Sequence, residues 1–344
     1  MRLLVTGGAG FIGSNFCHYI TENRKDWSIT VLDKLTYAGR LENLETIPRG
    51  NRFRFVQGDI CSPEAAAEAM SGCDVVVNFA AETHVDRSID DPSSFVRTDI
   101  EGVRILLEEF RREPGRRLFL QISTDEVYGS VEAGRSKESD ALEPRSPYSA
   151  SKAGGELLAM SYFTTFGVPV AVTRASNNYG PFQYPEKLIP LFITNVFQGE
   201  NLPLYGDGGN IRDWLFVTDH CSALEAVIEK GKPGRIYNIG AGQGKTNLEV
   251  TTAILEATGA SSDMIRRIED RPGHDRRYAL DISRITDELK WKPEVSFDQG
   301  IKRTVKWYTE NREWWQSIRS GEFMEYYRRM YEERLQISEG TEGK

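Results

Sequence analysis

The chain of 344 residues is 39% hydrophobic and 27% charged, which is typical of a globular protein with one large or two modest domains. Its formal net charge of −8 argues against a general nucleic-acid-binding protein, although a local basic pocket for a phosphorylated small molecule remains compatible with it. No apolar run approaches the ~20 residues of a membrane span, so no membrane partner is expected.

Short apolar runs alternate with helical patterns through the first half of the chain. This alternation predicts a parallel sheet covered by helices on both faces. The runs are nearly continuous in apolar residues, as in strands that are buried on both faces. The predicted fold class is α/β, a Rossmann-type doubly wound parallel sheet. The predicted strands lie at 3–5, 29–32, 53–56, 75–77, 118–120 and 168–172, and predicted helices lie at 63–70 and 103–112.

The pattern changes after about residue 175. Turn-rich segments at 177–181 and 205–210 precede a strand-like run at 235–239 and two helical patterns. These features predict a smaller, partly interleaved α/β substrate-binding lobe. We expect a first domain at 1–175 plus about 213–240, and a second at about 176–212 plus 241–335.

The C-terminal region divides into two parts. The stretch 307–331 is rich in aromatic residues, and we expect a helix there that packs onto the body of the protein. The residues 336–344 are mostly polar or small, which predicts a disordered tail.

A glycine-rich turn, Thr-Gly-Gly-Ala-Gly-Phe-Ile-Gly at 6–13, follows the first predicted strand and opens a helix. Such glycines let a pyrophosphate approach the backbone N–H groups of the helix N-terminus. Asp33 ends the second predicted strand, where an acid accepts from a ribose 2′-hydroxyl and repels a 2′-phosphate. The pattern favours NAD over NADP, although Lys34 and Arg40 weaken the charge argument. The alternative is a purely structural glycine turn.

Tyr148 and Lys152 are four residues apart, so a helix through both would place them on one face. A tyrosine has an ordinary pKa near ~10, and a nearby cation lowers the pKa by favouring the phenolate. The pair therefore predicts a proton-accepting tyrosine supported by a lysine. The alternative, two surface residues of a helix, is weakened by Ser123 and Thr124 at the end of a predicted strand.

Two adjacent acids, Asp125 and Glu126, follow that strand directly. A regular strand would send them to opposite faces of the sheet, so they can act on one ligand only if the strand ends by Thr124. Adjacent carboxylates repel each other, and one of them can stay protonated to form an acid–base pair. The alternative is a pair of solvated loop acids or a helix N-cap.

These motifs resemble those of the extended short-chain dehydrogenase/reductase family and, within it, those of the dTDP-glucose 4,6-dehydratases. The glycine turn and the Tyr–Lys pair mark only the superfamily, whereas Thr-Asp-Glu and Arg-Pro-Gly-His-Asp are more specific. The resemblance covers the chain from residue 6 to residue 278. The segments that carry the narrower resemblance are 80–88, 124–129, 177–181, 185–190, 212–214 and 271–278.

The resemblance implies a reaction without net redox change on dTDP-glucose. A hydride leaves sugar C4 for NAD⁺, water is lost across C5–C6, and the hydride returns to C6. Tyr148 with Lys152 would be the base for the 4-hydroxyl, and Thr124 would share its proton or orient it. Glu126 would remove the C5 proton and Asp125 would protonate the leaving hydroxyl. Physical reasoning supports the need for two acids but leaves their assignment open.

The resemblance also implies two sets of binding residues. Asp59 could reach the adenine of the cofactor or cap a helix, and Asn247 could bind substrate or cap the helix beginning near Leu248. For His84, a structural contact with Asp86 is an equal alternative. The cofactor set is Gly7, Gly10, Phe11, Ile12, Gly13, Asp33, Lys34, Thr36, Asp59, Ile60, Ala80, Ala81, Thr98, Tyr148 and Lys152. The substrate set is Thr83, His84, Asn178, Lys187, Leu188, Tyr205, Arg212, Asn247 and His274.

Asp99 departs from the family pattern, which more often has Asn after the Thr of this segment. Asn both donates and accepts hydrogen bonds, whereas an ionised Asp only accepts them. This position is therefore not expected to relay a water molecule to Lys152. Alternatively, Asp99 pairs with a nearby cation.

The four cysteines form no C-x-x-C pair and the four histidines are scattered, so no metal site is expected and the thiols are predicted to be reduced. The first residues, 1–5, lead directly into the glycine turn and leave no room for a signal peptide. We therefore expect a cytoplasmic enzyme. The resemblance implies a homodimer joined through helices, one of them following Tyr148.

Two kinds of protein compete with this interpretation. A nucleotide-sugar 4-epimerase or decarboxylase would use the same glycine turn, Tyr148 and Lys152, but an epimerase does not need Asp125 and Glu126. A non-catalytic NAD-binding regulator would not need the intact set of Thr124, Tyr148 and Lys152.

Overall fold

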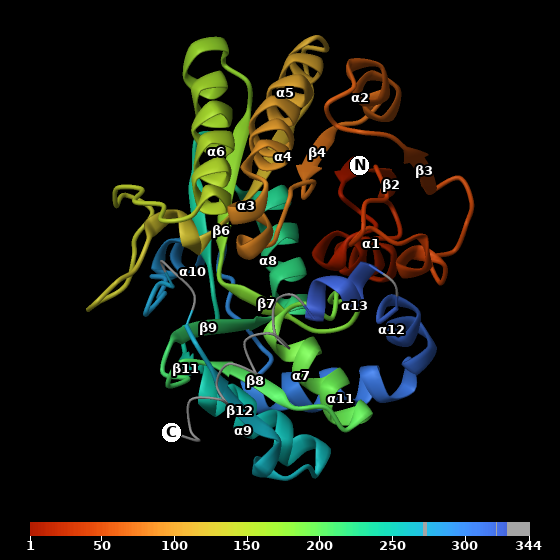
Figure 1. Ribbon diagram of the computed structural model, residues 1–344. Helices are drawn as coiled ribbons and strands as arrows, with labels where there is room; N and C mark the ends of the chain where they lie inside the picture. The colour runs from red at the N-terminus through yellow and green to blue at the C-terminus, as the bar shows by residue number, and fades with distance from the viewer. Residues whose placement is uncertain (271–273, 321, 329–344) are drawn as a thin grey trace.

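The structure, a computed structural model, describes residues 1–270, 274–320 and 322–328. A parallel sheet with the strand order β10-β6-β5-β4-β1-β2-β3 forms its centre, which confirms the predicted fold class (Figure 1). Its strands are β1 (Arg2–Thr6), β2 (Ser28–Asp33), β3 (Phe53–Gln57), β4 (Val75–Asn78), β5 (Leu118–Thr124), β6 (Val170–Ala175) and β10 (Ile236–Ile239). The sixth strand begins later than predicted, because Pro169 has no N–H to give to the sheet.

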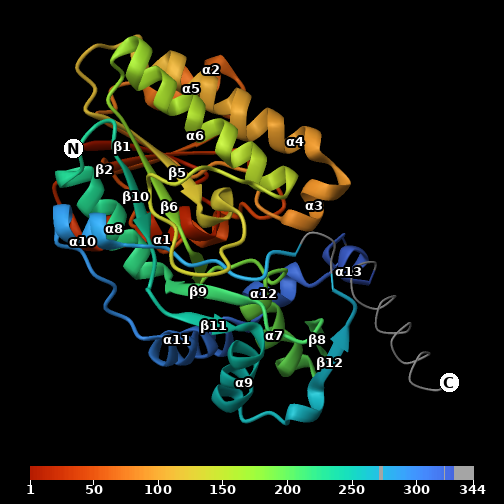
Figure 2. The same cartoon turned by 90° about the vertical axis from the view of Figure 1, so that its left-hand side faces the viewer.

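Helices cover both faces of this sheet (Figure 2). Alternate side chains of a strand point to opposite faces, so Leu3 and Val5 pack in one apolar cluster and Leu4 packs in another. The first cluster includes residues of α1 (Phe11–Asn23) and α8 (Val217–Lys230). The second includes residues of α2 (Pro63–Met70), α5 (Val103–Arg111) and α6 (Pro147–Phe166).

The long helix α6 has clear start and stop signals. The side chain of Ser146 accepts a hydrogen bond from the backbone N–H of Ser149, the backbone N–H of Ser146 donates to the side chain of Ser149, and Pro147 occupies the first turn. Gly167 ends the helix with a φ of 69°, a left-handed conformation that glycine adopts without steric cost. The helix packs against β5 and β6, which fixes its first turn beside the end of β5.

A second lobe lies beyond the carboxyl edge of the main sheet and has its own apolar core. The segment 177–179, expected only to turn, forms a short strand. The lobe has two small sheets, with the orders β11-β9-β7 and β12-β8. Its elements are β7 (Asn177–Tyr179), α7 (Leu188–Gln198), β8 (Leu202–Tyr205), β9 (Ile211–Phe216), β11 (Gly244–Thr246), α9 (Asn247–Thr258) and β12 (Ile265–Ile268).

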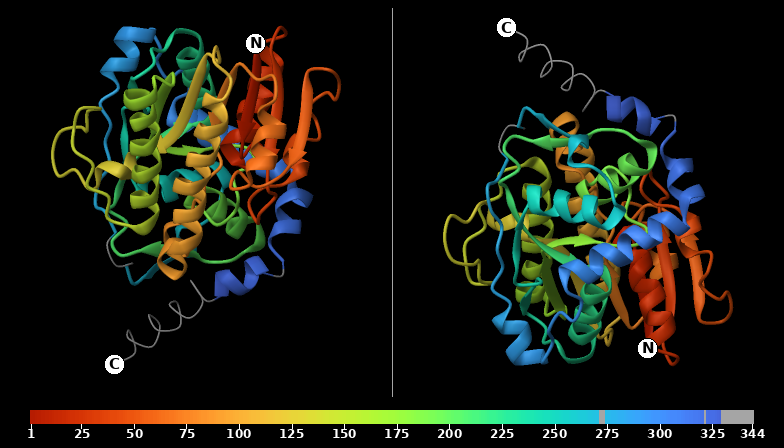
Figure 3. Two further views of the ribbon diagram at one scale, coloured as in Figure 1. Left: turned by 90° about the horizontal axis from the view of Figure 1, so that it is seen from above. Right: turned by 90° about the horizontal axis from the view of Figure 1, so that it is seen from below.

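The aromatic C-terminal stretch forms more than one helix, contrary to the prediction of a single one. In this region lie α11 (Phe297–Glu310), α12 (Arg312–Ile318) and α13 (Glu322–Tyr327). α11 and α12 contribute to the apolar core of the second lobe, and seen from below they run toward the N-terminal elements (Figure 3). The indole N–H of Trp314 in α12 donates to the side chain of Asn43 at 2.8 Å, which links this helix to the N-terminal part of the protein.

The remaining elements are short. They are η1 (Leu41–Leu44), α3 (Val85–Asp90), α4 (Pro92–Val96), η2 (Arg97–Gly102), η3 (Asp125–Tyr128), η4 (Ser262–Met264) and α10 (Ser283–Leu289). The predicted domain boundaries stay a prediction, and the predicted disordered tail lies outside the described residues. None of the helices in the described part of the chain is long and apolar enough to cross a membrane.

Candidate active site

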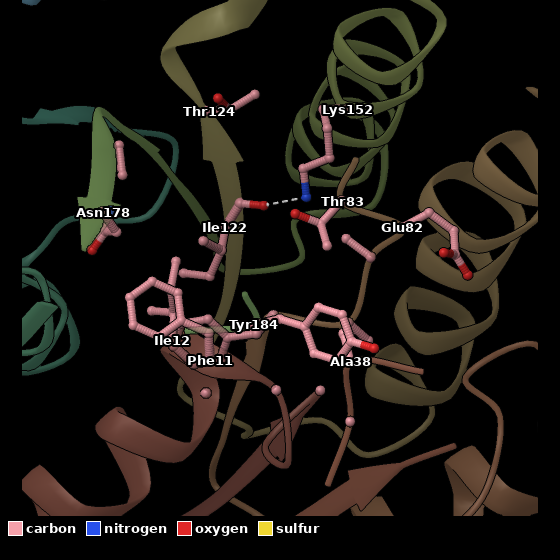
Figure 4. A pocket seen from close by; sticks show the side chains of 18 of the residues that line it. Phe11, Ile12, Ala38, Glu82, Thr83, Ile122, Thr124, Lys152, Asn178 and Tyr184 are labelled. Atoms are coloured by element: carbon pink, nitrogen blue, oxygen red, sulfur yellow. Dashed lines mark hydrogen bonds between the residues drawn. The ribbon is translucent and has the colours of Figure 1, made fainter. Parts of the chain in front are cut away.

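A cavity of about 350 Å³ opens at the carboxyl ends of the parallel strands, the edge at which α/β folds bind ligands. Every residue predicted to be catalytic and every residue predicted to bind the cofactor lines it. Figure 4 shows Lys152 of α6 reaching the carbonyl of Ile122 on β5, with Asn178 of β7 on the other side of the cavity. The cavity is therefore shared by the main sheet and the first strand of the second lobe.

The glycine turn forms the floor of one end of the cavity. Gly7 has a φ of 65°, and a Cβ there would meet the backbone N of Ala80 at 2.7 Å. A Cβ on Gly13 would lie 2.3 Å from the carbonyl oxygen of Gly7. No side chain caps the N-terminus of α1 at Gly10, so its first N–H groups remain available to an anionic group such as a pyrophosphate.

Asp33 lies buried at the end of β2. Its two carboxylate oxygens accept hydrogen bonds from the backbone N–H groups of Ala9 and Leu35, both at 2.8 Å. A carboxylate has about four lone-pair sites, so acceptor capacity remains for ribose hydroxyls. Lys34 pairs with Asp59 at 2.8 Å, so this cation already has a carboxylate partner. These residues fit NAD, and a 2′-phosphate would meet the Asp33 carboxylate.

The chain leaves strand geometry at Thr124, as the sequence required. Thr124 has extended dihedral angles, and its hydroxyl accepts the backbone N–H of Glu126 at 3.3 Å, which caps the 3₁₀ turn η3. Asp125 and Glu126 occupy the first turn of η3 and both line the cavity. The turn thus brings two consecutive carboxyl groups to one space, which a regular strand would not allow.

The two acids have different surroundings. Asp125 is 3% exposed, and its Oδ2 atom has no hydrogen-bond partner among the described residues. Burial and then the charge of Glu126 raise the pKa of Asp125 well above its usual value, and Arg212 opposes this shift. Glu126 is only partly buried. Asp125 is therefore the carboxyl group of the pair whose surroundings favour the protonated form.

Tyr148 and Lys152 lie in the first turns of α6, on the side that lines the cavity. The Lys152 ammonium donates to the carbonyl of Ile122 at 2.8 Å. The expectation that the cation lowers the pKa of Tyr148 is wrong for the protein alone. Burial, Glu126 and Asp99 raise the pKa of Tyr148 well above its usual value, while a hydrogen bond with Thr124 acts in the opposite direction.

The predicted substrate residues divide between two places. Thr83, Asn178, Lys187 and Leu188 line the cavity. The Lys187 ammonium donates to the carbonyl of Thr83 at 2.7 Å, which closes one side of the cavity between two distant segments. The hydroxyl-bearing Thr83 and the amide of Asn178 can hydrogen-bond to sugar oxygens.

Tyr205, Arg212, Asn247 and His274 lie outside the wall of this cavity. Arg212 donates to the carbonyl of Asp275 at 2.8 Å, and the Tyr205 and His274 rings lie edge to face with centroids 6.1 Å apart. Arg212 is close enough to Asp125 to act on its pKa. This second group therefore lies on the side of the site that holds Asp125.

Contacts bear on two of the alternatives left open by the sequence. Thr246, not Asn247, caps α9, because its hydroxyl accepts the backbone N–H of Glu249 at 3.1 Å. His84 is buried outside the cavity wall, with its Nδ1 atom 3.7 Å from a carboxylate oxygen of Asp86. This geometry fits the structural alternative for His84.

Sequence reasoning missed several residues of the cavity wall. His220, in the first turn of α8, contacts Asn178 Oδ1 through Nδ1 at 3.0 Å, and its Nε2 atom has no partner within the described chain. Burial lowers the pKa of His220 to about 3, so the ring is neutral. Trp214 and Gln183 also line the cavity with buried polar atoms that have no partner among these residues. Trp214 lies within the segment 212–214 and Gln183 lies between the segments 177–181 and 185–190, but a buried helical histidine gives no comparable signal.

Comparisons with known proteins agree with this geometry. Residues 4–304 match the model of a family described as GDP-mannose 4,6 dehydratase. The chain is 50% identical over 324 residues to a dTDP-glucose 4,6-dehydratase from Streptomyces niveus, covering 93% of this chain and 96% of that one.

Two solved structures show the same fold. The dTDP-glucose 4,6-dehydratase DesIV from Streptomyces venezuelae, solved with NAD bound, superimposes with a TM-score of 0.89 and 48% identity over 92% of this chain and 100% of its own. A UDP-glucose 4-epimerase from Thermus thermophilus in complex with NAD has a TM-score of 0.83 and 32% identity over 90% and 100%. The fold is thus shared by dehydratases and epimerases, and the side chains of the site must distinguish them.

Proposed function

The chain belongs to the GDP-mannose 4,6 dehydratase family, and on this premise we propose that it is an NAD-dependent dTDP-glucose 4,6-dehydratase. The reaction converts dTDP-glucose to dTDP-4-keto-6-deoxyglucose and water. One observation carries the choice over a 4-epimerase: Asp125 and Glu126 open into the cavity that also holds Tyr148 and Lys152. Oxidation at C4 requires only the second pair, whereas elimination of water requires an additional acid and base.

Tyr148 acts as the base for the sugar 4-hydroxyl. The hydrogen bond with Thr124 favours its phenolate, and Thr124 is placed to share the proton. The Lys152 ammonium is buried one helical turn further along α6 and adds a positive charge to the same cavity. When bound, NAD⁺ would accept the hydride from C4 and, once reduced, would return it to C6, and the positive ring of the oxidised form would favour the phenolate.

Asp125 and Glu126 carry out the elimination. The 4-ketone acidifies the C5 proton, Glu126 removes that proton, and Asp125 gives its own proton to the departing C6 hydroxyl. The burial that keeps Asp125 protonated supports this assignment, because an acid must hold its proton at neutral pH. The partial exposure of Glu126 suits a carboxylate that must be ionised.

The diphosphate of the substrate needs local positive charge, because the protein as a whole is acidic. Lys187 lies at the cavity wall, and Arg212, in the second group of polar residues, is close enough to Asp125 to act on its pKa. We place the nucleotide part of dTDP-glucose along Lys187, Arg212 and His274. A guanidinium can form a forked pair of hydrogen bonds with a phosphate, which suits Arg212 for this role.

We also propose a homodimer that forms through the helices beside the sheet. Exposed apolar side chains are found on α3, α4 and α6, namely Ile89, Val96 and Leu157, which are 52%, 53% and 58% exposed. Figures 1 and 2 show α4 and α6 side by side on one flank of the molecule. The free thiols, of which Cys17, Cys73 and Cys221 are buried, support a reducing, cytoplasmic location.

The proposed activity is tested by incubating the purified protein with dTDP-glucose, with and without added NAD. We expect the 4-keto-6-deoxy product in the presence of NAD, and its formation without added NAD would indicate that cofactor remains bound after purification. UDP-glucose serves as the matched control for nucleotide preference. No product in the presence of NAD contradicts the proposal, and formation of dTDP-galactose would identify a 4-epimerase.

A further inference from the structure

The charge of Lys152 is buried. The side chain is 6% exposed, and within the described residues its ammonium donates one hydrogen bond, to the carbonyl of Ile122. An ammonium has three donors and a strong preference for water, so burial without a counter-charge destabilises its charged form. Burial lowers the pKa of Lys152, and only Asp99 and Glu156 are found to oppose that shift among the described residues.

Glu156, on the same helix as Lys152, already forms an ion pair with another cation, Arg174. Its carboxylate oxygens accept hydrogen bonds from Arg174 at distances of 2.5 to 3.2 Å, and both side chains are almost fully buried. Arg174 is held in turn by the hydroxyl of Tyr128 at 2.6 Å. This pair neutralises itself, which leaves Asp99 as the counter-charge for Lys152.

The fold holds Asp99 firmly in place. It lies in η2, a π-helical turn, and is 2% exposed. Its Oδ2 atom accepts the hydroxyl of Ser151 at 2.6 Å, and its Oδ1 atom accepts the backbone N–H of Glu82 at 3.2 Å. A Cβ on Gly155 would lie 2.3 Å from the carbonyl oxygen of Asp99, so glycine is needed for this close approach to α6.

We propose that Asp99 is the counter-ion of Lys152 and a positioning residue that sets the net charge around Tyr148 during the proposed oxidation at C4. Asp99 keeps the Lys152 ammonium in its charged form through Coulombic attraction. Its carboxylate is anchored by Ser151, the residue that precedes Lys152 on α6. The inference rests on the proposed function only for which reaction Tyr148 carries out. The charge coupling between Asp99, Lys152 and Tyr148 exists in the protein without substrate.

The charges that face these groups come from three elements. Glu82, after β4, and Lys152, on α6, act on Asp99. Glu126, on η3, acts on Tyr148 together with Asp99, and its neighbour Asp125 adds to this effect only in its ionised form. Burial raises the pKa of Asp99 to about 6, and Lys152 and the Ser151 hydroxyl oppose the shift, so Asp99 is ionised in neutral solution.

The sign of the coupling follows from these charges. An ionised Asp99 favours the protonated forms of both Lys152 and Tyr148, because each protonated form is the more positive one. Replacing Asp99 with a neutral isostere must therefore lower the pKa of both groups. A purely structural role for Asp99 would change stability or turnover without moving the two pKa values in the same direction.

Asp99→Asn is the test. The amide oxygen can accept from Glu82, and the amide N–H can donate to Ser151, whose hydroxyl also donates to the carbonyl of Tyr148 at 2.8 Å, so the local hydrogen bonds are retained. We expect both limbs of the pH profile of kcat/KM to move to lower pH by about one unit. A second readout needs no turnover: the pH titration of tyrosinate ultraviolet absorbance, taken as the difference from the matching Tyr148→Phe protein, should move in the same direction.

Two further variants complete the experiment. Glu101→Gln is the matched control, because Glu101 lies in the same turn but its side chain is 48% exposed and pairs with Arg104, so neither readout should move. Ser151→Ala removes one hydrogen bond from the ionised Asp99 carboxylate and leaves its charge in place, so both readouts should move slightly in the opposite direction, to higher pH. It decides the matter if Asp99→Asn does not fold.

A tyrosinate titration that stays unchanged, or moves to higher pH, in Asp99→Asn overturns the proposal. This holds even if the protein proves to have no activity on dTDP-glucose, because the titration does not depend on turnover. Failure of the dehydratase assay alone therefore contradicts the proposed function and leaves the role of Asp99 to be decided by the titration.

Discussion

The two walls of the cavity are built in different ways. The cofactor wall, made of the glycine turn 7–13 and the loops after β2, β3 and β4, comes from consecutive segments of the chain. The substrate wall, made of residues from 175–178 and 183–188 with Trp214 and His220, comes from segments joined by long-range contacts. All predicted cofactor residues line the cavity, whereas several predicted substrate residues lie outside its wall.

The difference follows from the parallel sheet. Parallel strands place all of their carboxyl ends at one edge, so a motif at a strand end indicates its own position in space. No such rule places the residues of the substrate wall, because most of them do not lie at the ends of parallel strands. Lys187 meets Thr83, and His220 meets Asn178, only because loops and helices from distant parts of the chain pack together. We expect substitutions of the reacting groups, which lie between the two walls, to have the largest effects on turnover.

Tyr148→Phe should have the largest effect. Removing the phenol removes the proposed base while leaving the ring packing, so kcat should fall by about 10²–10⁴-fold. Single-turnover measurements should show no transient reduced nicotinamide, because the block precedes hydride transfer. The affinity for NAD should change little, since the rest of the cofactor wall is intact. A variant that still forms reduced nicotinamide at the wild-type rate would remove Tyr148 from this role.

Glu126→Gln should have the next largest effect. Without a base at C5, solvent deuterium should not enter that position, and dehydration should slow by about 10²–10³-fold. Asp125→Asn is the matched comparison. It should retain deuterium exchange at C5 but lose elimination, because only the acid for the C6 hydroxyl is missing. If Glu126→Gln leaves deuterium incorporation unchanged, Glu126 is not the C5 base and the two roles must be exchanged.

The sequence predicted the main sheet and the cofactor wall because their signals are local. The end of β5 at Thr124 could be inferred because two adjacent acids cannot share one face of a strand. The resemblance to the dehydratases, drawn from short motifs, is confirmed by the family match and by relatives that cover most of the chain.

The charges around the reacting groups could not be read from the sequence. Lys152 stands four residues from Tyr148, so its effect on the pKa was visible, but burial and the carboxylates of Asp99 and Glu126 were not. The difference between Asp125 and Glu126 depends on burial and on Arg212, which is distant in the chain. Such balances arise only when separate elements pack together.

The cofactor wall is tested by Asp33→Asn. An amide in place of the carboxylate would direct an N–H group at the backbone donor of Ala9 or of Leu35, and one of these hydrogen bonds would be lost. We expect about a tenfold or greater loss of NAD affinity and a smaller preference against NADP, both measurable by calorimetry. Glu42→Gln, an exposed acid nearby, is the control and should change neither value. An unchanged NAD affinity would show that Asp33 does not bind the ribose of the cofactor.

The substrate wall is tested by Arg212→Lys, which keeps the charge but loses the planar fork. The guanidinium lies over the ring of Tyr278 at 4.2 Å and donates to the carbonyl of Asp275 at 2.8 Å, so its direction is fixed. A lysine would place a point charge near the proposed diphosphate without paired hydrogen bonds. We expect KM for dTDP-glucose to rise by about 3- to 10-fold, equivalent to about 1 kcal/mol, with little change in kcat or NAD affinity.

The control for that experiment is Arg276→Lys, because the Arg276 side chain is 59% exposed and pairs with Asp207 on the surface, so kinetics should stay unchanged. Retention of the positive charge in Arg212→Lys keeps Asp125 under the same electrostatic influence, which separates substrate binding from the proton chemistry. A fall in kcat with an unchanged KM would instead link Arg212 to Asp125, and the group of Tyr205, Arg212 and His274 would then support catalysis rather than hold the nucleotide.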